Sequence, residues 1–177
     1  MIRFLSETEY CDTIPLLTAC FGEDPEFIRD YYGDASVPGD VLHCRIAVKE
    51  VDRKIVSMVH LKPVTAVYDH APEDRRTLPV TYLMCVATDP AYRHRGYMDE
   101  VMHFVTDALL SEGAPWCFLI AVDRQIYRHL HFIHDWDLTP EELELLYADD
   151  GLTKASARLL NASHMEYPDR ILSGFVS

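Results

Sequence analysis

The stretch from Tyr82 to Val105 constrains the fold of this chain more than any other, because a buried strand, a basic turn and a helix follow one another within it. Seven mostly apolar residues ending at Thr88 predict the strand, and Asp89-Pro90 ends it. Apolar residues then recur at helical spacing as far as Glu112-Gly113 and predict one face of a helix. These positions are Met98, Val101, Met102, Val105 and Leu109.

The turn between this strand and this helix is predicted to bind an anion. The first N–H groups of a helix have no intrahelical partner and lie at the positive end of the helix dipole, so they attract phosphate. Arg93, His94 and Arg95 precede the helix, and Gly96 has no side chain to keep a ligand from the backbone. A diphosphate fits this pattern. The structural alternative is an ordinary turn with solvated arginines.

The remaining strands predict the fold class. Trp116 to Val122 is a second buried strand, and the helix between the two makes them parallel neighbours whose carboxyl ends meet where α/β sheets bind ligands. Residues 41–51 and 55–68 predict an antiparallel hairpin, in which Pro63 marks an edge or bulge. We therefore expect an α/β (α+β) fold, with a mixed, mostly antiparallel sheet that splays at two parallel strands and is flanked by helices.

Two helices are predicted near the N-terminus. Ser6 and Glu9 have the spacing of a capping box, and Gly22 ends the first helix. The second runs from Asp24 to Tyr32. Residues 34–40 and 69–77 are predicted to be polar connections. Helices are also expected after Thr139-Pro140 and over residues 154–160, so we expect one domain over residues 1–135 and a helical extension over residues 136–177 packed on it.

Composition excludes several classes of function. The net charge of -13 disfavours binding to nucleic acid or to anionic membranes. Five scattered cysteines without a Cys-x-x-Cys pair predict neither a disulfide framework nor a zinc site, and they are interpreted as small buried hydrophobes. The spacing of His129, His131 and His134 matches no known metal-ligand pattern. Without a membrane-length apolar run or a signal peptide, the expected location is the cytoplasm.

The basic turn resembles the signature of the GCN5-related N-acetyltransferase (GNAT) family, Arg/Gln-x-x-Gly-x-Gly/Ala. The segment 93–98, Arg-His-Arg-Gly-Tyr-Met, agrees with it at the first and fourth positions. At the sixth position, where a small residue is usual, this chain has Met98. A bulky residue at that position makes the chain similar to the N-terminal region of enhanced-intracellular-survival-type acetyltransferases. The family also has a helix tyrosine that is followed four and five residues later by Gly-Phe. Here Tyr127 and Phe132 match the tyrosine and the phenylalanine, and His131 stands in place of the glycine.

The resemblance implies acetyl-CoA as the cosubstrate and no metal. The pantetheine arm would bind like an added strand to the backbone of Val86, Ala87 and Thr88. The pyrophosphate would meet the basic turn. The further cofactor-binding residues that the resemblance implies are Arg93, His94, Arg95, Gly96, Tyr97, Met98 and, after the second parallel strand, Asp123.

The implied reaction is direct attack on the thioester by a primary amine of a small molecule or peptide. Tyr127 is the implied proton donor to the leaving thiolate, because a phenol has a pKa of about 10 and a thiol about 8.5. A tyrosine packed on the core is the structural alternative. His60 is a candidate base, although a lone strand histidine is more often a core residue.

Two questions stay open at this level. A non-catalytic module that keeps the fold and binds CoA or a partner is the alternative function, because Met98 and His131 depart from the family pattern. A homo-oligomer is also left open. The acceptor cleft is expected at the second helix, the loop over residues 34–40 and the second hairpin strand. Its acidic residues, which would favour a cation, are Asp24, Glu26, Asp30 and Asp34.

Overall fold

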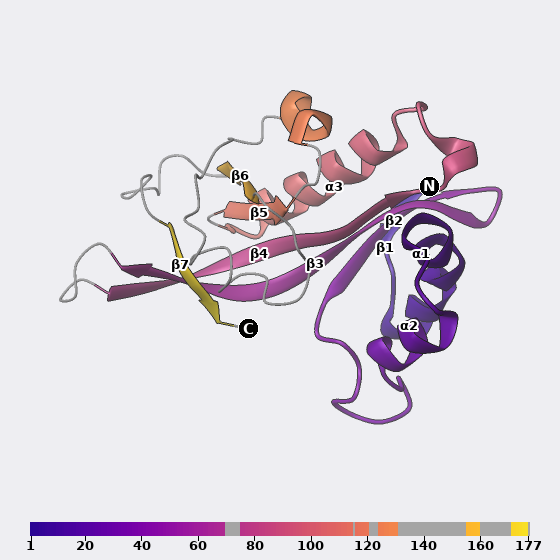
Figure 1. Ribbon diagram of the computed structural model, residues 1–177, viewed down its shortest axis with the longest axis horizontal. Coiled ribbons are helices and arrows are strands. Elements are labelled where there is room, and N and C mark those ends of the chain that lie inside the picture. The colour runs from indigo at the N-terminus through magenta and orange to yellow at the C-terminus, as the bar shows by residue number, and fades with distance from the viewer. Residues whose placement is uncertain (70–74, 115, 121–123, 131–154, 160–170, 177) are drawn as a thin grey trace. The chain divides into compact units, whose positions relative to one another are not determined.

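The strands of the computed structural model form a mixed sheet in the order β1-β2-β3-β4-β5-β6, with β7 paired to β3 (Figure 1). The structure describes residues 1–69, 75–114, 116–120, 124–130, 155–159 and 171–176. These residues belong to two compact units. The first unit comprises Met1–Lys62 and Met84–Val105, and the second comprises Pro63–Leu83 and Thr106–Ser177. The strands are β1 Ile2–Phe4, β2 Arg45–Val51, β3 Lys54–Asp69, β4 Arg75–Thr88, β5 Trp116–Ile120, β6 Ala155–Leu159 and β7 Ile171–Val176.

The helical segments are of two kinds. Three are α-helices: α1 Ile14–Phe21, α2 Pro25–Tyr32 and α3 Tyr97–Ser111. Three are short 3₁₀ helices: η1 Glu7–Thr13, η2 Pro90–Tyr92 and η3 Arg124–Leu130. In the described part of the chain, none of these helices is long and apolar enough to cross a bilayer.

The predicted pairings are confirmed. β2 and β3 form the antiparallel hairpin, and Asp52 and Arg53 at its turn have φ of 50° and 65°, a backbone whose twist matches that of the flanking strands. β4 and β5 are parallel. Pairing with β2 along β3 ends at Leu61 and pairing with β7 begins at Thr65, so Pro63 lies between these two registers.

Several predicted boundaries were wrong. The first helix is two segments, the 3₁₀ helix η1 and then α1, and the connection expected over residues 69–77 is shortened because β3 reaches Asp69 and β4 begins at Arg75. The helix expected over residues 154–160 is instead β6, which pairs antiparallel with β5. Pairing overrides the weak helix propensity of this short stretch. The helix expected after Thr139 lies outside the described residues, and the domain boundary at residue 135 stays a prediction.

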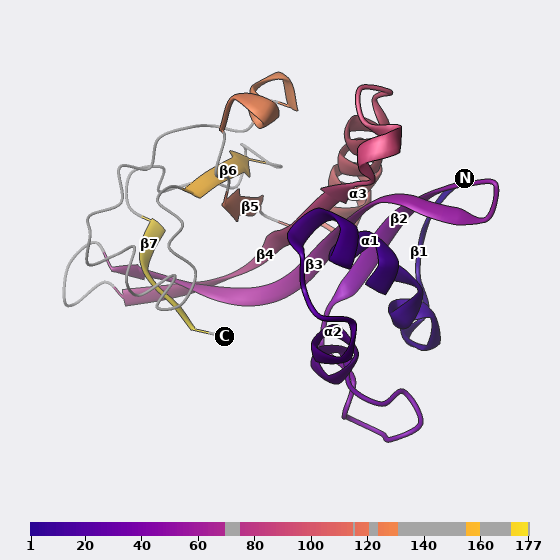
Figure 2. The ribbon, with the colours of Figure 1, turned by 45° about the vertical axis from the view of Figure 1, so that its right-hand side comes forward.

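The core of the first unit lies between its N-terminal helices and the sheet. Strand side chains alternate between faces, so Ile46 and Val48 of β2 join the core under α1 and α2, whereas Lys49 contacts Glu100 of α3 on the opposite face. Figures 1 and 2 show α1 and α2 on one side of β2 and α3 on the other. The core cluster comprises Leu5, Tyr10, Ile14, Leu16, Leu17, Ile28, Tyr32, Cys44, Ile46, Val48, Met58 and Ala87.

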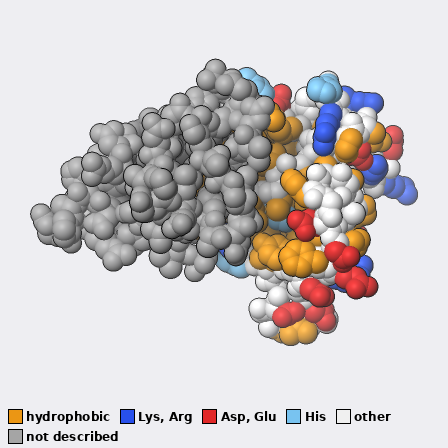
Figure 3. Space-filling model, in the orientation of Figure 1, with side chains coloured by type: hydrophobic (Ala, Val, Ile, Leu, Met, Phe, Trp, Pro, Cys, Tyr) orange, Lys and Arg blue, Asp and Glu red, His pale blue; other side chains and the backbone are white. Residues whose placement is uncertain are grey.

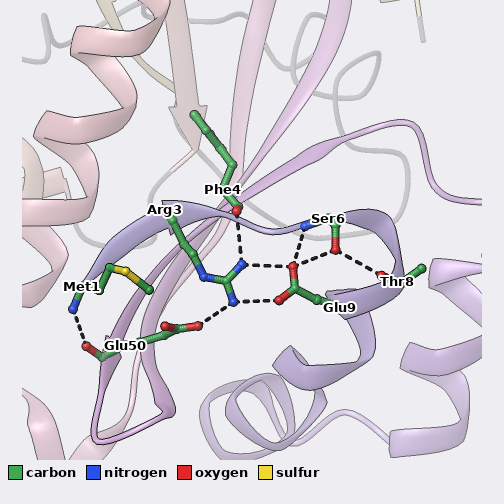
Figure 4. A network of polar contacts seen from close by, with 7 residues as sticks. All are labelled: Met1, Arg3, Phe4, Ser6, Thr8, Glu9 and Glu50. Carbon is green, nitrogen blue, oxygen red and sulfur yellow. Dashed lines mark hydrogen bonds and ion pairs between the residues drawn. The ribbon is translucent and has the colours of Figure 1, made fainter.

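A polar network fixes the start of the chain (Figure 4). The guanidinium of Arg3 donates to both carboxylate oxygens of Glu9, at 3.0 and 2.8 Å, and to Glu50 at 2.7 Å. Glu9 also accepts from the backbone N–H of Ser6 at 2.8 Å, which completes the predicted capping box. Arg3 and then Ser6 lower the pKa of Glu9 to about 2, so this carboxylate stays charged throughout the neutral range.

The five cysteines are free thiols, as expected, but only two of them are buried. Cys44 and Cys117 lie in the interior, Cys20 and Cys85 are half-buried, and Cys11 is exposed. The interpretation of all five as buried hydrophobes was therefore wrong for Cys11, whose position on η1 faces solvent.

Candidate functional site

The carboxyl end of β4 has an unusual backbone conformation. The register between β4 and β5 joins Thr81–Leu83 to Cys117–Leu119, and the described residues show no β5 partner for β4 after Leu83. Two residues later Cys85 has φ of 51°, a left-handed backbone that a non-glycine residue rarely adopts.

The other edge of β4 is held firmly by β3. Ser57 Oγ donates to the carbonyl of Ala87 at 3.0 Å and lies 2.9 Å from Thr88 Oγ1. The backbone N–H of Asp89 donates to the carbonyl of Val56 at 2.9 Å. Cys20 Sγ of α1 also lies 3.4 Å from the carbonyl of Thr88. These contacts fix the carboxyl end of β4 against β3 and α1.

The basic turn has the backbone of an anion-binding nest. His94 and Gly96 have φ of 61° and 76°, with Arg95 between them. Left-handed residues that alternate with other conformations in this way turn successive N–H groups toward one point. α3 begins at Tyr97, and its first intrahelical bond runs from the N–H of Glu100 to the carbonyl of Gly96 at 3.0 Å. A Cβ added to Gly96 would meet no atom within 4 Å, so the space in front of this residue is open.

The two arginines of the turn are exposed and anchored to backbone carbonyls. Arg93 Nε donates to the carbonyl of Thr88 at 3.2 Å, and Arg95 donates to the carbonyl of Ala91 at 3.3 Å. The guanidinium of Arg95 also lies 5.1 Å from the centre of the Tyr92 ring. Anchoring shortens the range of both side chains, so their charge stays beside the turn.

Two lysines of the hairpin neutralise the acids around the turn. Lys54 Nζ lies 2.6 Å from Asp89 and holds the pKa of that carboxyl below its usual range. Lys49 Nζ lies 2.5 Å from Glu100 in the first turn of α3. Asp89 and Glu100 therefore each have a lysine partner beside the basic turn.

Tyr127 belongs to the second unit, on η3. Its ring is half-buried, and burial raises the pKa of its phenol to about 12. The phenol is therefore protonated at every pH at which the protein would be assayed, which is the state a donor requires. Asp123, the other predicted residue of this region, lies outside the described residues.

His60 is fully buried and belongs to a directed chain of hydrogen bonds. Thr13 Oγ1 donates to the carbonyl of Tyr10 at 2.7 Å and lies 2.6 Å from Tyr32 Oη, which lies 3.0 Å from His60 Nε2. Because the hydroxyl hydrogen of Thr13 goes to a carbonyl, Tyr32 donates to Thr13 and must accept from His60. His60 is thus the Nε2–H tautomer.

This tautomer makes His60 a poor base. Its Nδ1 carries a lone pair that has no partner among the described residues, and burial lowers the pKa of the ring to about 4. The side chain is completely buried, with a relative exposure of 0%. His60 is therefore a neutral core residue, which was the structural alternative considered from the sequence.

The role of the predicted site residues stays a prediction, and nothing in the sequence indicated one backbone feature near them. The structure brings together, in its first unit, the strand end from Val86 to Thr88 and the turn from Arg93 to Met98. The left-handed backbone at Cys85 was missed, since cysteine carries no preference for that conformation and the residue was interpreted as a packed strand position. Among the described residues, no group of three or more His, Cys, Asp or Glu side chains is placed to hold a metal ion.

Comparisons with known families and structures agree on one fold. A family model described as "Acetyltransferase (GNAT) domain" matches residues 1–134. No curated protein sequence matches the chain.

Solved structures with low sequence identity share the fold. The GNAT family N-acetyltransferase YhbS from Escherichia coli, solved in complex with CoA, is 18% identical with a TM-score of 0.62, over 91% of this chain and 81% of that chain. A GCN5-related N-acetyltransferase from Kribbella flavida is 20% identical with a TM-score of 0.58, and the match covers 76% of this chain and 34% of that chain. For Eis1 from Mycobacterium abscessus (16% identity, TM-score 0.58) the shares are 75% and 31%.

The chain thus spans about a third of the length of the Kribbella and Mycobacterium proteins. At these identities the likeness concerns the fold. It confirms the predicted mixed, mostly antiparallel sheet with a parallel pair and flanking helices.

Proposed function

Because the chain belongs to the GNAT acetyltransferase family, we propose that it transfers the acetyl group of acetyl-CoA to a primary amine of a small molecule or peptide. The observation that carries this proposal is the succession of a strand end with the left-handed residue Cys85, a turn with two positive-φ residues and a helix N-terminus within residues 84–98. An extended amide-bearing chain followed by a diphosphate suits that succession.

The fit of acetyl-CoA can be argued residue by residue. The amides of its pantetheine arm would pair with the backbone of Val86, Ala87 and Thr88. The N–H groups from His94 to Met98 would bind the pyrophosphate, with Arg93 and Arg95 supplying charge. Open space in front of Gly96 supports close approach of an anion to the backbone. Asp123 stays a predicted cofactor-binding residue.

The reaction would be a direct transfer. The neutral amine attacks the thioester carbonyl, a C–N bond forms, the C–S bond breaks, and the sulfur leaves with the bonding electrons. Tyr127 is the proposed donor to that sulfur, and the proton lost from the amine passes to water. A fully buried, neutral His60 is not proposed as the base. We expect the protein in the cytoplasm, acting without a metal.

We expect Gly96→Ala to weaken acetyl-CoA binding at least tenfold, which corresponds to about 1.4 kcal/mol. The added methyl group would stand where the diphosphate approaches the backbone. The measurement is a thermal-shift titration with acetyl-CoA, in which a ligand that binds only the folded protein stabilises it by about 2.7 kcal/mol at a hundredfold excess over Kd.

Gly22→Ala is the matched control. Gly22 ends α1 with φ of 73°, and its added Cβ would also meet no atom within 4 Å, so both variants carry the same backbone strain. Their unliganded midpoints should fall equally, while only Gly96→Ala loses affinity. Equal affinity of the two variants, or no shift of the wild type at millimolar acetyl-CoA, would remove the turn from cofactor binding.

The non-catalytic module is the second candidate, favoured by Met98 in place of the usual small residue. An assay of free-thiol release from acetyl-CoA across a panel of primary amines separates the two. Release that depends on an amine supports transfer, whereas saturable acetyl-CoA binding with no release for any amine supports the module.

A further inference from the structure

Helix α2 carries two apolar stripes, and only one of them is in the core. Ile28 and Tyr32 are 4% and 1% exposed and pack inward. Phe27 and Tyr31 are 60% and 41% exposed. At 100° per residue these two rings lie next to one another, about a third of a turn from the buried pair. A helix that only needed to cover the core would not require the second stripe.

Two carboxylates complete this exposed surface. Glu26 and Asp30 lie one turn apart, beside Phe27 and Tyr31 in the order of the helical wheel, and both are exposed. We call these four residues the α2 outer face. Within the described part of the chain, neither Glu26 nor Asp30 has an ion pair. Like charges at this spacing repel each other, and a bound cation would relieve the repulsion.

The surroundings of this face are acidic as well. Between Glu23 and Asp40 the chain has six carboxylates and a single cation, Arg29. Three of the carboxylates have structural roles: Asp24 caps α2, Asp34 accepts from Ser36, and Asp40 accepts from the N–H of Asp34. Figure 3 shows carboxylates and hydrophobic side chains together over the part of the surface where Figure 1 draws α2 and the loop after it.

Two further exposed hydrophobic side chains belong to the segments that precede and follow α2 in the sequence. Phe21 at the end of α1 is 50% exposed, and Val37 in the loop after α2 is 49% exposed. Together with the α2 outer face they offer more apolar area than one ammonium group would cover. The basic turn of the same unit has the opposite charge, so the unit is electrostatically divided, with Lys and Arg gathered elsewhere on the face drawn in Figure 3.

We propose that the α2 outer face docks a Lys- and Arg-rich segment of a partner protein. Ammonium and guanidinium groups are attracted both to carboxylates and to the faces of aromatic rings. The aliphatic stems of the same side chains cover apolar surface. An anionic partner is excluded by the charge of residues 23–40. This docking does not depend on acetyl transfer, because it requires neither acetyl-CoA nor turnover.

The test is the binding of fluorescein-labelled octa-arginine to the whole protein, followed by fluorescence anisotropy at low and at physiological salt. We expect saturable binding that weakens with salt. Phe27→Ala and Tyr31→Ala should each weaken it about two- to fivefold, the range expected for an exposed cation–aromatic contact. Glu26→Gln combined with Asp30→Asn should weaken it further, and labelled octa-glutamate should not bind.

Matched controls separate this face from general ionic attraction. Asp52→Asn removes an exposed carboxylate at the β2–β3 turn, and Leu110→Ala removes an exposed apolar side chain of α3, so neither should change the affinity. All substitutions are at exposed positions, and circular dichroism checks the fold.

Three results would overturn the proposal. Binding that is insensitive to Phe27→Ala and Tyr31→Ala would show charge attraction alone. Spermine that competes as strongly as the peptide would show a polyamine site in place of a protein interface. Self-association in sedimentation that Phe27→Ala abolishes would assign the face to a second copy of the chain.

Discussion

Replacing Tyr127 by phenylalanine is expected to lower kcat for amine acetylation by about 100-fold or more, the usual range for removing a general acid, and to leave the affinity for acetyl-CoA unchanged. The substitution keeps the ring and removes only the hydroxyl that would donate to the leaving sulfur. Because burial raises the pKa of this phenol to about 12, the wild-type rate should show no loss that is due to Tyr127 ionisation below about pH 10. Steady-state kinetics and a thermal-shift titration measure the two quantities.

Tyr82→Phe is the control for losing a tyrosine hydroxyl in the same unit. Its ring stacks on Phe118 with centroids 4.8 Å apart, and phenylalanine keeps that contact. We expect Tyr82→Phe to retain turnover. If Tyr127→Phe also retains it while acetyl-CoA still binds, Tyr127 has no part in the chemistry and is the packed helix tyrosine of the structural alternative.

The free energy of unfolding is expected to fall by about 3 kcal/mol between pH 6.5 and pH 4 because of His60 alone. The pKa of its ring is 6.5 in the unfolded chain and about 4 in the folded protein. At pH values between these two pKa values, the His60 ring is protonated in the unfolded chain and neutral in the folded protein. The contribution is therefore complete above pH 6.5 and is lost as the pH falls toward 4.

The hydrogen-bond chain explains why the His60 ring stays neutral in the folded protein. Tyr32 already accepts from Nε2–H, so the new proton would go to Nδ1, where no described residue can accept it. The measurement is urea unfolding of wild type and His60→Gln from pH 7 to pH 4. Glutamine can still donate an N–H to Tyr32 and does not titrate, so the variant should lose stability less steeply.

His43→Gln provides the control, because His43 is an exposed histidine of the same unit. It should show the same loss of stability with pH as the wild type. Parallel curves for wild type and His60→Gln would show that His60 is protonated in the folded protein as readily as in the unfolded chain.

The sequence alone determined the elements that depend on local pattern. The basic turn, with Gly96 and its arginines, could be predicted because phosphate binding uses backbone N–H groups at a strand-to-helix junction, and that junction has clear breakers at Asp89-Pro90. The parallel pair followed from a helix placed between two apolar strands. The ends of α2 followed from Asp24 and Gly33, whose local chemistry starts and stops helices.

Tertiary structure decided what depends on neighbours far along the chain. β6 could not be told from a helix because its small and mixed residues favour neither state, and pairing with β5 settled the matter. The left-handed backbone at Cys85 lies two residues after Leu83 of β4, and no local signal in the sequence marks it. The tautomer of His60 follows from Thr13 and Tyr32, which lie on η1 and α2 and meet it only in the folded core. Local chemistry therefore determined the strand, the basic turn and the helix that follows it, whereas long-range packing determined the backbone at Cys85 and which histidine stays neutral.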